Sequence, residues 1–276
     1  MKRWEIDSLE RYAISYSMEV DWSRVKELTL WNYDELITKI QNVLNYEFVQ
    51  KHYNHKLKKV GKYTASLLNY SDKKKYDDYS KRNLNTLRQI EIFGVRDISD
   101  LITTISNPDE CVNFLQYASV TFEELIVLLN CILRWILPFS RPIRDFIEAE
   151  DTNQLEYLSK LRTRGIRANL DMIEECRTEM GRESMAVLTE VPRDFILMLL
   201  LRADISRLPW IRGKTVLALS SAGYDTLDKI ANATVEKMES KLKIAVESSG
   251  KKYSRSWIEP DGAIAQAKVL PKVLDF

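Results

Sequence analysis

The chain has 276 residues, of which 45% are hydrophobic, and its 41 basic and 40 acidic side chains leave a formal net charge of +1. This length and hydrophobic content allow a sizeable core in one large domain or in several small ones. The balanced charge excludes a globally basic field, so any contact with nucleic acid must come from a local patch. Glycine and proline are both scarce, which favours long helices over a turn-rich β fold.

The chain shows no sign of export or membrane insertion. Residues 1–12 are charged and hold no apolar run, so they do not predict a signal peptide. The most apolar stretches, Phe122–Ile136 and Phe195–Leu201, are too short to span a bilayer. Three widely spaced cysteines are typical of reduced thiols: Cys111, Cys131 and Cys176. We therefore expect a cytoplasmic protein.

Residues 1–83 are predicted to form an N-terminal helical domain whose second half is basic. From Lys51 to Arg82, lysines are interleaved with tyrosines and few acidic residues oppose them. This pattern is typical of a nucleic-acid surface, on which cations meet phosphates and rings stack on bases. A solvated helix and linker with half-buried tyrosines would produce the same pattern, so both interpretations stay open.

An internal repeat follows this domain. When residues 84–142 are shifted by 71 positions without a gap, Gly94 meets Gly165, and Leu137-Pro138 meets Leu208-Pro209. Matching leucines at core positions arise easily by chance. A glycine and a Leu-Pro pair that coincide at one constant offset are harder to explain in that way, and they predict a true repeat.

We therefore divide the rest of the chain into repeat 1 (84–153), repeat 2 (154–247) and a partly ordered C-terminal tail (248–276). Each repeat is predicted to begin with a helix that ends at its glycine, which suits a left-handed C-cap. A middle helix, a break and a strongly apolar helix follow, and then a Leu-Pro turn. The predicted breaks and helix starts are Asn107-Pro108, Gly181, Thr121, Pro192 and Thr234.

The segment Leu208–Leu219, LPWIRGKTVLAL, resembles the helix-hairpin-helix motif, in which L-P-G-I-G-x-K-T-A leads into an apolar helix. The tight turn of that motif exposes backbone N–H groups at the start of its second helix, where a phosphate can bind. Glycines let the nucleic-acid backbone approach closely, and a lysine and a threonine add a charge and a hydroxyl. Such contacts hold the phosphate backbone and do not read bases.

This chain departs from the motif at the turn itself. The two expected glycines are Trp210 and Arg212, and a glycine comes only one position later. A related segment at Leu137–Glu148, LPFSRPIRDFIE, contains no glycine. In that copy Pro142 removes a donor and Asp145 adds a repelling carboxylate, so we expect it to be structural.

A third ungapped copy, Leu57–Leu68, keeps a glycine in place at Gly61 and lies in the basic segment. We expect this copy to be the first candidate for a phosphate contact, and the copy at Leu208–Leu219 to be the second. The candidate residues are Lys58, Lys59, Gly61, Lys62 and Thr64, followed by Arg212, Gly213, Lys214 and Thr215. The alternative interpretation is that each hairpin only packs two helices together.

Residues 84–240 resemble domain of unknown function 4332, a family built of such hairpins. The resemblance rests on a helix that ends in Gly-Ile, an apolar helix, an alanine-aspartate helix, the hairpin and a final Ala-Gly turn. In this chain these parts are Gly165-Ile166, Phe195–Leu201, Ala203-Asp204-Ile205, LPWIRGKT and Ala222–Leu227. The resemblance implies an all-helical fold that binds nucleic acid or protein, and it implies no known reaction.

The sequence predicts no catalytic or metal site, because His52 and His55 are its only histidines and no cysteine lies near them. We predict an all-α protein of tandem helix-hairpin-helix-like repeats that binds DNA, or another nucleic acid, through phosphates with little sequence selectivity. The alternative is a protein–protein adaptor that uses the helical repeat surface. We expect no enzymatic activity, cofactor, metal, small-molecule substrate or membrane association.

Overall fold

The computed structural model describes residues 20–68, 74–148, 151–248, 250, 252–254 and 258–276. Across these ranges the chain is all-helical, as predicted, and its only β-type pairing consists of two isolated bridges. Residues 1–19, the start of the predicted N-terminal domain, lie outside the described residues. The finer prediction of tandem helix-hairpin-helix repeats stays a prediction.

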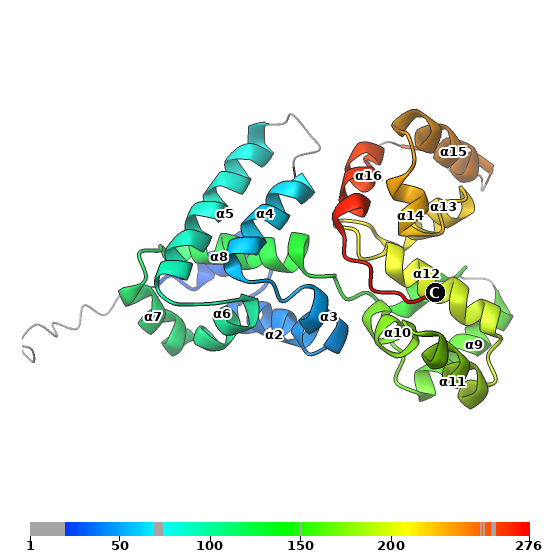
Figure 1. Cartoon of the computed structure of the whole chain (residues 1–276), viewed down its shortest axis with the longest axis horizontal. Helices are drawn as coiled ribbons and strands as arrows, with labels where there is room; N and C mark the ends of the chain where they lie inside the picture. Colours follow the sequence, from blue (N-terminus) through cyan, green and yellow to red (C-terminus); the bar gives the residue numbers. More distant parts are fainter. Residues whose placement is uncertain (1–19, 69–73, 149–150, 249, 251, 255–257) are drawn as a thin grey trace, which may run out of the picture.

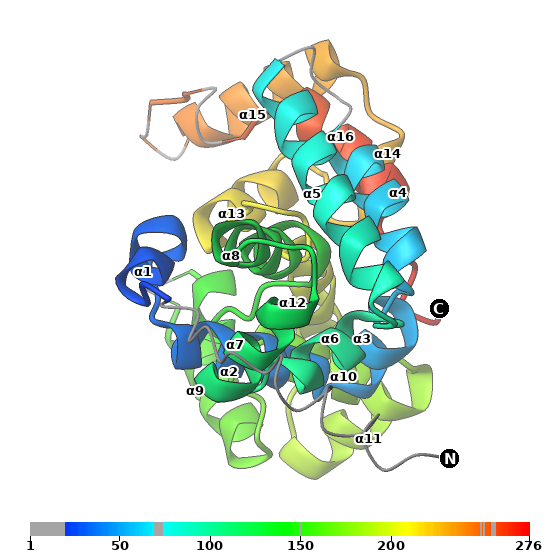
Figure 2. The same cartoon turned by 90° about the vertical axis from the view of Figure 1, so that its left-hand side faces the viewer.

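The first half of the chain surrounds one apolar helix. Its elements are α1 (Ser23–Thr29), α2 (Tyr33–Leu44), α3 (Glu47–His52), α4 (Leu57–Leu68), α5 (Lys74–Ile92), α6 (Ile98–Thr104), α7 (Pro108–Tyr117), α8 (Phe122–Cys131) and the π-helix η2 (Ile132–Ile136). Helix α8 packs between α1 and α5, as Figure 2 shows with α8 seen end-on. Helices α4 and α5 form a side-by-side pair that projects from this group (Figure 1).

The second half forms a separate group of helices on the right of Figure 1. Its elements are the 3-10 helix η3 (Ile143–Phe146), α9 (Thr152–Thr163), α10 (Asn169–Cys176), α11 (Glu179–Thr189), α12 (Arg193–Ile205), α13 (Gly213–Ser221), α14 (Leu227–Ala231), α15 (Val235–Ser248) and α16 (Pro260–Val269). Helix α12 packs on α10 and α11, while α14 packs on α16.

Local signals in the sequence place several helix starts correctly. Thr121 caps α8 in a capping box: its hydroxyl accepts the Glu124 amide at 3.3 Å, and the Glu124 carboxylate accepts the Thr121 amide at 2.9 Å. Pro192 directly precedes α12, and the Thr234 hydroxyl accepts the Lys237 amide at the start of α15. These predictions are confirmed because caps act within one helical turn.

The structure adds detail to two other predictions. The break predicted near Gly181 lies between α10 and α11, and Gly181 itself is in the first turn of α11, which Thr178 caps by accepting the Gly181 amide at 3.1 Å. A Cβ at position 181 would collide with the Glu175 carbonyl oxygen, so the glycine serves close packing after α10. The tail 248–276, predicted to be partly ordered, contains α16, whose Ala263 and Ile264 are buried where it packs against α14 and α4.

Buried polar contacts join the two groups of helices. The guanidinium of Arg207 in the 206–212 turn donates to the Asp204 carboxylate at 2.8 and 2.5 Å, to the Tyr53 hydroxyl beyond α3, and to the Pro271 carbonyl at 3.0 Å. The Tyr46 hydroxyl donates to the Asp171 carboxylate in α10 at 2.6 Å. A buried ion pair is stable only with its partners in place, so these contacts make the position of one group depend on the other.

Candidate functional site

The predicted hairpin at Leu57–Leu68 is wrong. These residues form α4, one continuous helix with no turn at Gly61. Gly61 is buried on the side that faces α5, where a Cβ would collide with the Leu84 side chain. Thr64 is also buried, and its hydroxyl donates to the Val60 carbonyl at 2.8 Å. Neither Gly61 nor Thr64 can reach a phosphate.

The ungapped match misled because it rested on apolar spacing alone. Its shared positions are buried along one side of α4: Leu57, Val60, Thr64 and Leu68. Residues three, four and seven apart share a helix face, so this spacing fits any amphipathic helix. In the segment 208–219, the first five residues instead form the turn that precedes α13.

The structure assigns Leu57 a different counterpart. The Leu57 amide donates to the carbonyl of Arg96 at 3.0 Å, and the Ile143 amide donates to the carbonyl of Arg167 at 2.9 Å. Each hydrogen bond belongs to one of the two isolated bridges. Its acceptor, Arg96 or Arg167, lies two residues after a glycine with positive φ. Leu57 therefore corresponds to Ile143. The ungapped comparison had instead aligned Leu57 with Leu208, whose counterpart in the first repeat is Leu137, six residues before Ile143.

The lysines of the first candidate remain on the surface: Lys58, Lys59 and Lys62 are exposed. The neighbouring tyrosines are turned inward, with Tyr53 fully buried and Tyr63, Tyr76 and Tyr79 half-buried. A ring can stack on a base only where its face is open. Among its described residues the segment therefore offers cations without an open ring for stacking, in line with the interpretation of half-buried tyrosines.

Five turns between helices in the described structure share one backbone feature, a residue with positive φ followed by a buried apolar residue. The positive-φ residues are Gly94 (105°), Gly165 (87°), Glu190 (55°), Trp210 (66°) and Gly223 (84°). Glycine is the residue that a left-handed backbone favours, because it has no Cβ. Trp210 and Glu190 are therefore the two exceptions among these five turns, and Trp210 has the bulkier side chain.

In the turn at Gly94, a carboxylate of the following helix occupies the exposed amide. Asp100 accepts the backbone amide of Arg96 at 2.9 Å and its guanidinium at 3.1 Å. The hydrogen bond from the Arg96 side chain, with that from its amide, lowers the pKa of Asp100 below the usual value. An anion that approached this turn would meet a site already filled by Asp100.

The turn at Gly165 is closed in the same way. The Asp171 carboxylate accepts the amide of Arg167 at 2.9 Å and the amide of Ala168 at 2.8 Å. Its other oxygen accepts the hydroxyl of Tyr46. Asp171 lies 71 residues after Asp100, so the same internal anion occurs at the same place in both predicted repeats.

The turn at Trp210 lacks this carboxylate. Asp100 and Asp171 each lie six residues after the glycine of their turn, and the residue six after Trp210 is Val216. Each is also the third residue of its helix, and the third residue of α13 is Thr215. In the part of the chain that the structure describes, the amides of Arg212, Gly213 and Lys214 donate no hydrogen bond. The start of α13 thus carries the positive end of the helix dipole without an internal anion.

The four predicted residues of this turn divide into two exposed and two buried side chains. Arg212 is the N-cap and makes no side-chain cap hydrogen bond, and both it and Lys214 are exposed. Gly213 is buried, and a Cβ there would lie 2.6 Å from the Cβ of Asp145 in η3. Thr215 is buried as well. The glycine serves the packing of α13 on η3, and the two cations form the accessible part.

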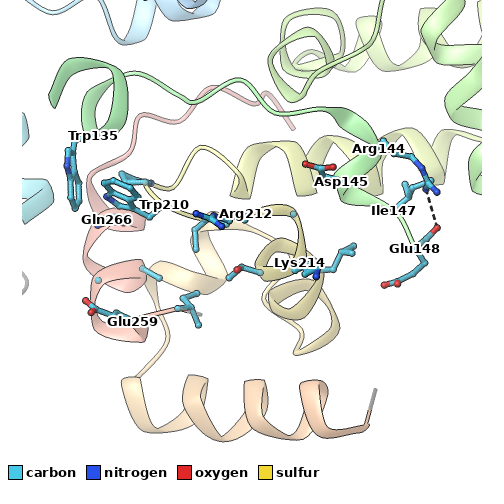
Figure 3. Close-up of a pocket in the computed structure, with 18 of the residues that line it drawn as sticks. Trp135, Arg144, Asp145, Ile147, Glu148, Trp210, Arg212, Lys214, Glu259 and Gln266 are labelled. Carbon is cyan, nitrogen blue, oxygen red and sulfur yellow. Dashed lines mark hydrogen bonds between the residues drawn. The ribbon is translucent and has the colours of Figure 1, made fainter. Parts of the chain in front are cut away.

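A groove of about 1360 Å³ opens in front of α13, between η2, η3 and α16 (Figure 3). Trp135 and Trp210 stand next to each other at one end of it, and Arg212 and Lys214 lie near its middle (Figure 3). Its charged lining residues are Arg144, Arg212, Lys214, Asp145, Glu148 and Glu259. Three cations therefore face three carboxylates, so the groove is polarised locally and close to neutral overall.

Residues far away in sequence hold the aromatic end of the groove. The rings of Trp135 and Trp210 are 5.5 Å apart in an edge-to-face arrangement with an interplanar angle of 70°. The guanidinium of Arg134 lies 5.3 Å from the Trp210 ring centre and 4.9 Å from that of Trp31. Sequence reasoning missed Arg134 and Trp135, because no motif or spacing links η2 to this turn.

A second arginine adds to the positive field at this turn. Burial, and after it the charge of nearby Arg212, lowers the pKa of Arg141 from its usual value, while Asp145 acts in the opposite direction. Arg141 is also in cation–π contact with Phe139. Two neighbouring guanidiniums disfavour each other's charge, so an incoming anion would be stabilised by both.

The other reactive groups do not assemble into a site. Within the described ranges no group of histidine, cysteine and carboxylate side chains could hold a metal ion. The three cysteines are free and buried, and burial raises the pKa of Cys111 to about 11. Burial lowers the pKa of both His52 and His55. No helix in the described part of the chain has the length and apolar character needed to cross a membrane.

Comparison with known proteins supports the predicted resemblance over the C-terminal part of the chain. No curated protein and no solved structure matches this chain. The family model described as Domain of unknown function (DUF4332) matches residues 154–268, from within α9 to within α16. The match includes the Gly165 and Trp210 turns and α16, and it begins after residues 84–153, which the resemblance drawn from the sequence had also included. Over residues 154–268 the chain is thus similar to domain of unknown function 4332.

Proposed function

We propose that the protein is a non-enzymatic module that binds nucleic acid, DNA first of all, by holding a backbone phosphate at the start of α13. The observation that carries this proposal is the missing carboxylate in the Trp210 turn. Asp100 and Asp171 accept amides just before α6 and α10, whereas the Arg212 amide at the equivalent place before α13, and the Gly213 and Lys214 amides after it, have no such internal partner in the described structure. A phosphate oxygen supplies the same kind of acceptor as a carboxylate.

The side chains at this turn suit a phosphate and do not suit base recognition. Arg212 and Lys214 extend from the first turn of α13, where the helix dipole adds a further preference for negative charge. Contacts to phosphate oxygens carry no sequence information, so we propose binding with little sequence selectivity. The helix-hairpin-helix resemblance of LPWIRGKT supports the same role for the α12–α13 turn.

The balanced charge of the groove limits how strong this binding can be. Two cations and one helix end can engage one or two phosphates, while Asp145, Glu148 and Glu259 repel a longer backbone. We therefore expect affinity in the non-specific range, with dissociation constants of roughly 10⁻⁴–10⁻⁶ M. For two phosphate contacts, log K should fall with log salt concentration at a slope of about −2.

Fluorescence anisotropy with a labelled duplex, titrated at several salt concentrations, tests the proposal. The double variant Arg212→Ala, Lys214→Ala should bind about tenfold more weakly, which corresponds to about 1.4 kcal/mol, and should show a flatter salt slope. The matched control is Arg167→Ala, which removes an exposed arginine from the closed Gly165 turn. Loss of binding in the control, or unchanged binding in the double variant, would contradict the proposal.

The alternative role as a protein–protein adaptor is favoured by one surface. Helix α11 exposes three apolar side chains on one face: Met180, Val187 and Leu188. Unpaired apolar side chains that line up on a helix face are a common docking surface. Under this alternative, Val187→Glu should abolish association that size-exclusion chromatography with light scattering detects, and Arg212→Ala should leave that association intact.

A further inference from the structure

Trp210 occupies a turn position that glycine fills in three of the other four turns. Its φ is 66°; the corresponding residues are Gly94, Gly165 and Gly223 in those three turns and Glu190 in the fourth. A left-handed backbone is strained for a residue with a bulky side chain, and glycine would relieve that strain. The ring is nevertheless 51% exposed, so burial in the core does not account for it.

Neighbouring side chains hold this exposed ring in place. Arg134 lies against the ring at 5.3 Å from its centre, and Arg134 is itself packed on Trp31 and donates to the Thr29 carbonyl at 3.2 Å. Trp135 meets the ring edge-to-face. The indole is thus supported by η2 and still borders the groove (Figure 3). A fixed and open aromatic ring is suited to stack on a planar partner.

We infer that the groove takes a single-stranded nucleic acid, with one base stacked on Trp210 and the adjoining phosphate at the start of α13. This inference rests on the proposed function and specifies its ligand. Trp210 and the two cations belong to one turn, Trp210 to Lys214, and they line the same groove. Because the ring and the cations belong to one short turn, one base and its adjoining phosphate can engage both.

The lining of the groove favours a single strand over a duplex. In a duplex the base faces are stacked within the helix and are closed to a protein ring, whereas an unpaired base presents a free π-face. The groove volume of about 1360 Å³ exceeds the roughly 300–1000 Å³ of typical small-molecule pockets, so more than one nucleotide fits. Its carboxylates would oppose the dense charge of a duplex backbone but leave room for a single phosphate at Arg212.

The test compares labelled oligothymidine and oligouridine of about 12 nucleotides with a duplex of the same length, by anisotropy at low salt. The wild-type protein should bind at least one single strand more tightly than the duplex. Trp210→Leu keeps apolar bulk beside Trp135 but cannot stack, and it should weaken single-strand binding by about 5- to 150-fold. Trp210→Phe should retain most of the binding, and duplex binding should change little in either variant.

Trp210→Gly separates loss of the ring from loss of the fold, because glycine suits the backbone at this position. It should retain a wild-type melting temperature and lose single-strand binding to the same extent as Trp210→Leu. Equal binding of single strand and duplex, with no effect of either Trp210 variant, would overturn the inference and leave the phosphate contact standing. Failure of every oligonucleotide to bind would overturn the proposed function together with the inference.

Discussion

The Gly165 turn and the Trp210 turn have similar backbones, but the first holds an internal carboxylate and the second exposes two cations. In the first, Asp171 brings a carboxylate onto the two amides at the start of α10, so the turn is complete without a ligand. In the second, no carboxylate accepts the amides at the start of α13 in the described structure, and two exposed cations stand there. Both turns place a positive-φ residue before a buried apolar residue, Ile166 or Ile211.

This difference shows how one side chain decides whether a turn is structural or available to a ligand. A helix start always leaves amides without partners, and something must satisfy them. When the next helical turn supplies an aspartate, the chain satisfies itself and gains stability. In the Trp210 turn the residue in the place of that aspartate is Thr215 or Val216, so the amides stay open to solvent or to an external anion. The predictions below alter one turn or the other.

The largest effect is expected when the internal anion is removed from the closed turn. Asp171→Ala leaves the amides of Arg167 and Ala168 and the hydroxyl of Tyr46 without their acceptor. We expect a loss of about 2–3 kcal/mol in the free energy of unfolding, measured by urea denaturation. Asp171→Asn keeps one acceptor oxygen and should lose less. A loss below about 0.5 kcal/mol for Asp171→Ala would show that the carboxylate does not hold this turn together.

The two turns also use glycine for different purposes. Gly213→Ala would force a Cβ against the backbone and Cβ of Asp145, and we expect it to cost about 1–3 kcal/mol. Gly165→Ala meets no atom within 4 Å and should cost about 1 kcal/mol through its positive φ alone. Thermal unfolding of both variants checks the order, and a smaller effect for Gly213→Ala would contradict the close packing of α13 on η3.

Helix boundaries were predictable because their causes are local. Gly94 and Gly165 end helices in left-handed turns, and Thr121, Pro192 and Thr234 begin them, as predicted. Caps and left-handed glycines act within a few residues, so one sequence contains the whole interaction. The all-helical class followed from the same signals, together with the scarcity of glycine and proline.

Tertiary contacts account for what the sequence could not predict. Gly61 suggested a turn, but packing of α4 on α5 needs a small residue at that point, and a helix tolerates it there. Arg134 and Trp135 contact Trp210 only because η2 folds back onto the α12–α13 turn. The role of Gly213 likewise depends on Asp145, which lies in another element. No periodicity or motif in the sequence indicates these contacts between residues that lie far apart in the chain.

Placing an internal anion in the open turn should convert it to the closed kind. Arg212→Asp puts a favoured N-cap residue at the extended N-cap position of α13, where its carboxylate can accept the Lys214 or Thr215 amide. We expect a gain of about 1 kcal/mol in the free energy of unfolding and no measurable binding of oligonucleotides. Separate urea and anisotropy measurements would show stability and binding moving in opposite directions.

The control for this variant lies in the closed turn. Ala168→Asp places a carboxylate at the N-cap of α10 beside Asp171, which already accepts the amide of residue 168, so repulsion should cancel the capping gain. A stability gain in Ala168→Asp as large as that in Arg212→Asp would show that the two turns do not differ in their open amides.

A smaller effect is expected from the carboxylate nearest to the open turn. Asp145 lines the groove and contacts Gly213, so its charge opposes a phosphate at the start of α13. Asp145→Asn should tighten oligonucleotide binding about two- to threefold at low salt, and the gain should disappear at about 200 mM salt as screening increases. Unchanged affinity at low salt would place the bound phosphate farther from η3 than we propose.

The smallest effect concerns the internal anion of the Gly94 turn. The hydrogen bond from Arg96 lowers the pKa of Asp100, so this carboxylate stabilises the fold above its unfolded pKa of about 3.9, and the contribution is lost as the pH falls through the lower folded value. Because the side chain is partly exposed, we expect Asp100→Asn to cost less than about 1 kcal/mol at pH 6. Urea denaturation of wild type and variant at pH 6 and at about pH 3 should show this difference shrinking in acid. A difference that stays constant with pH would mean that the Asp100 charge does not stabilise the turn.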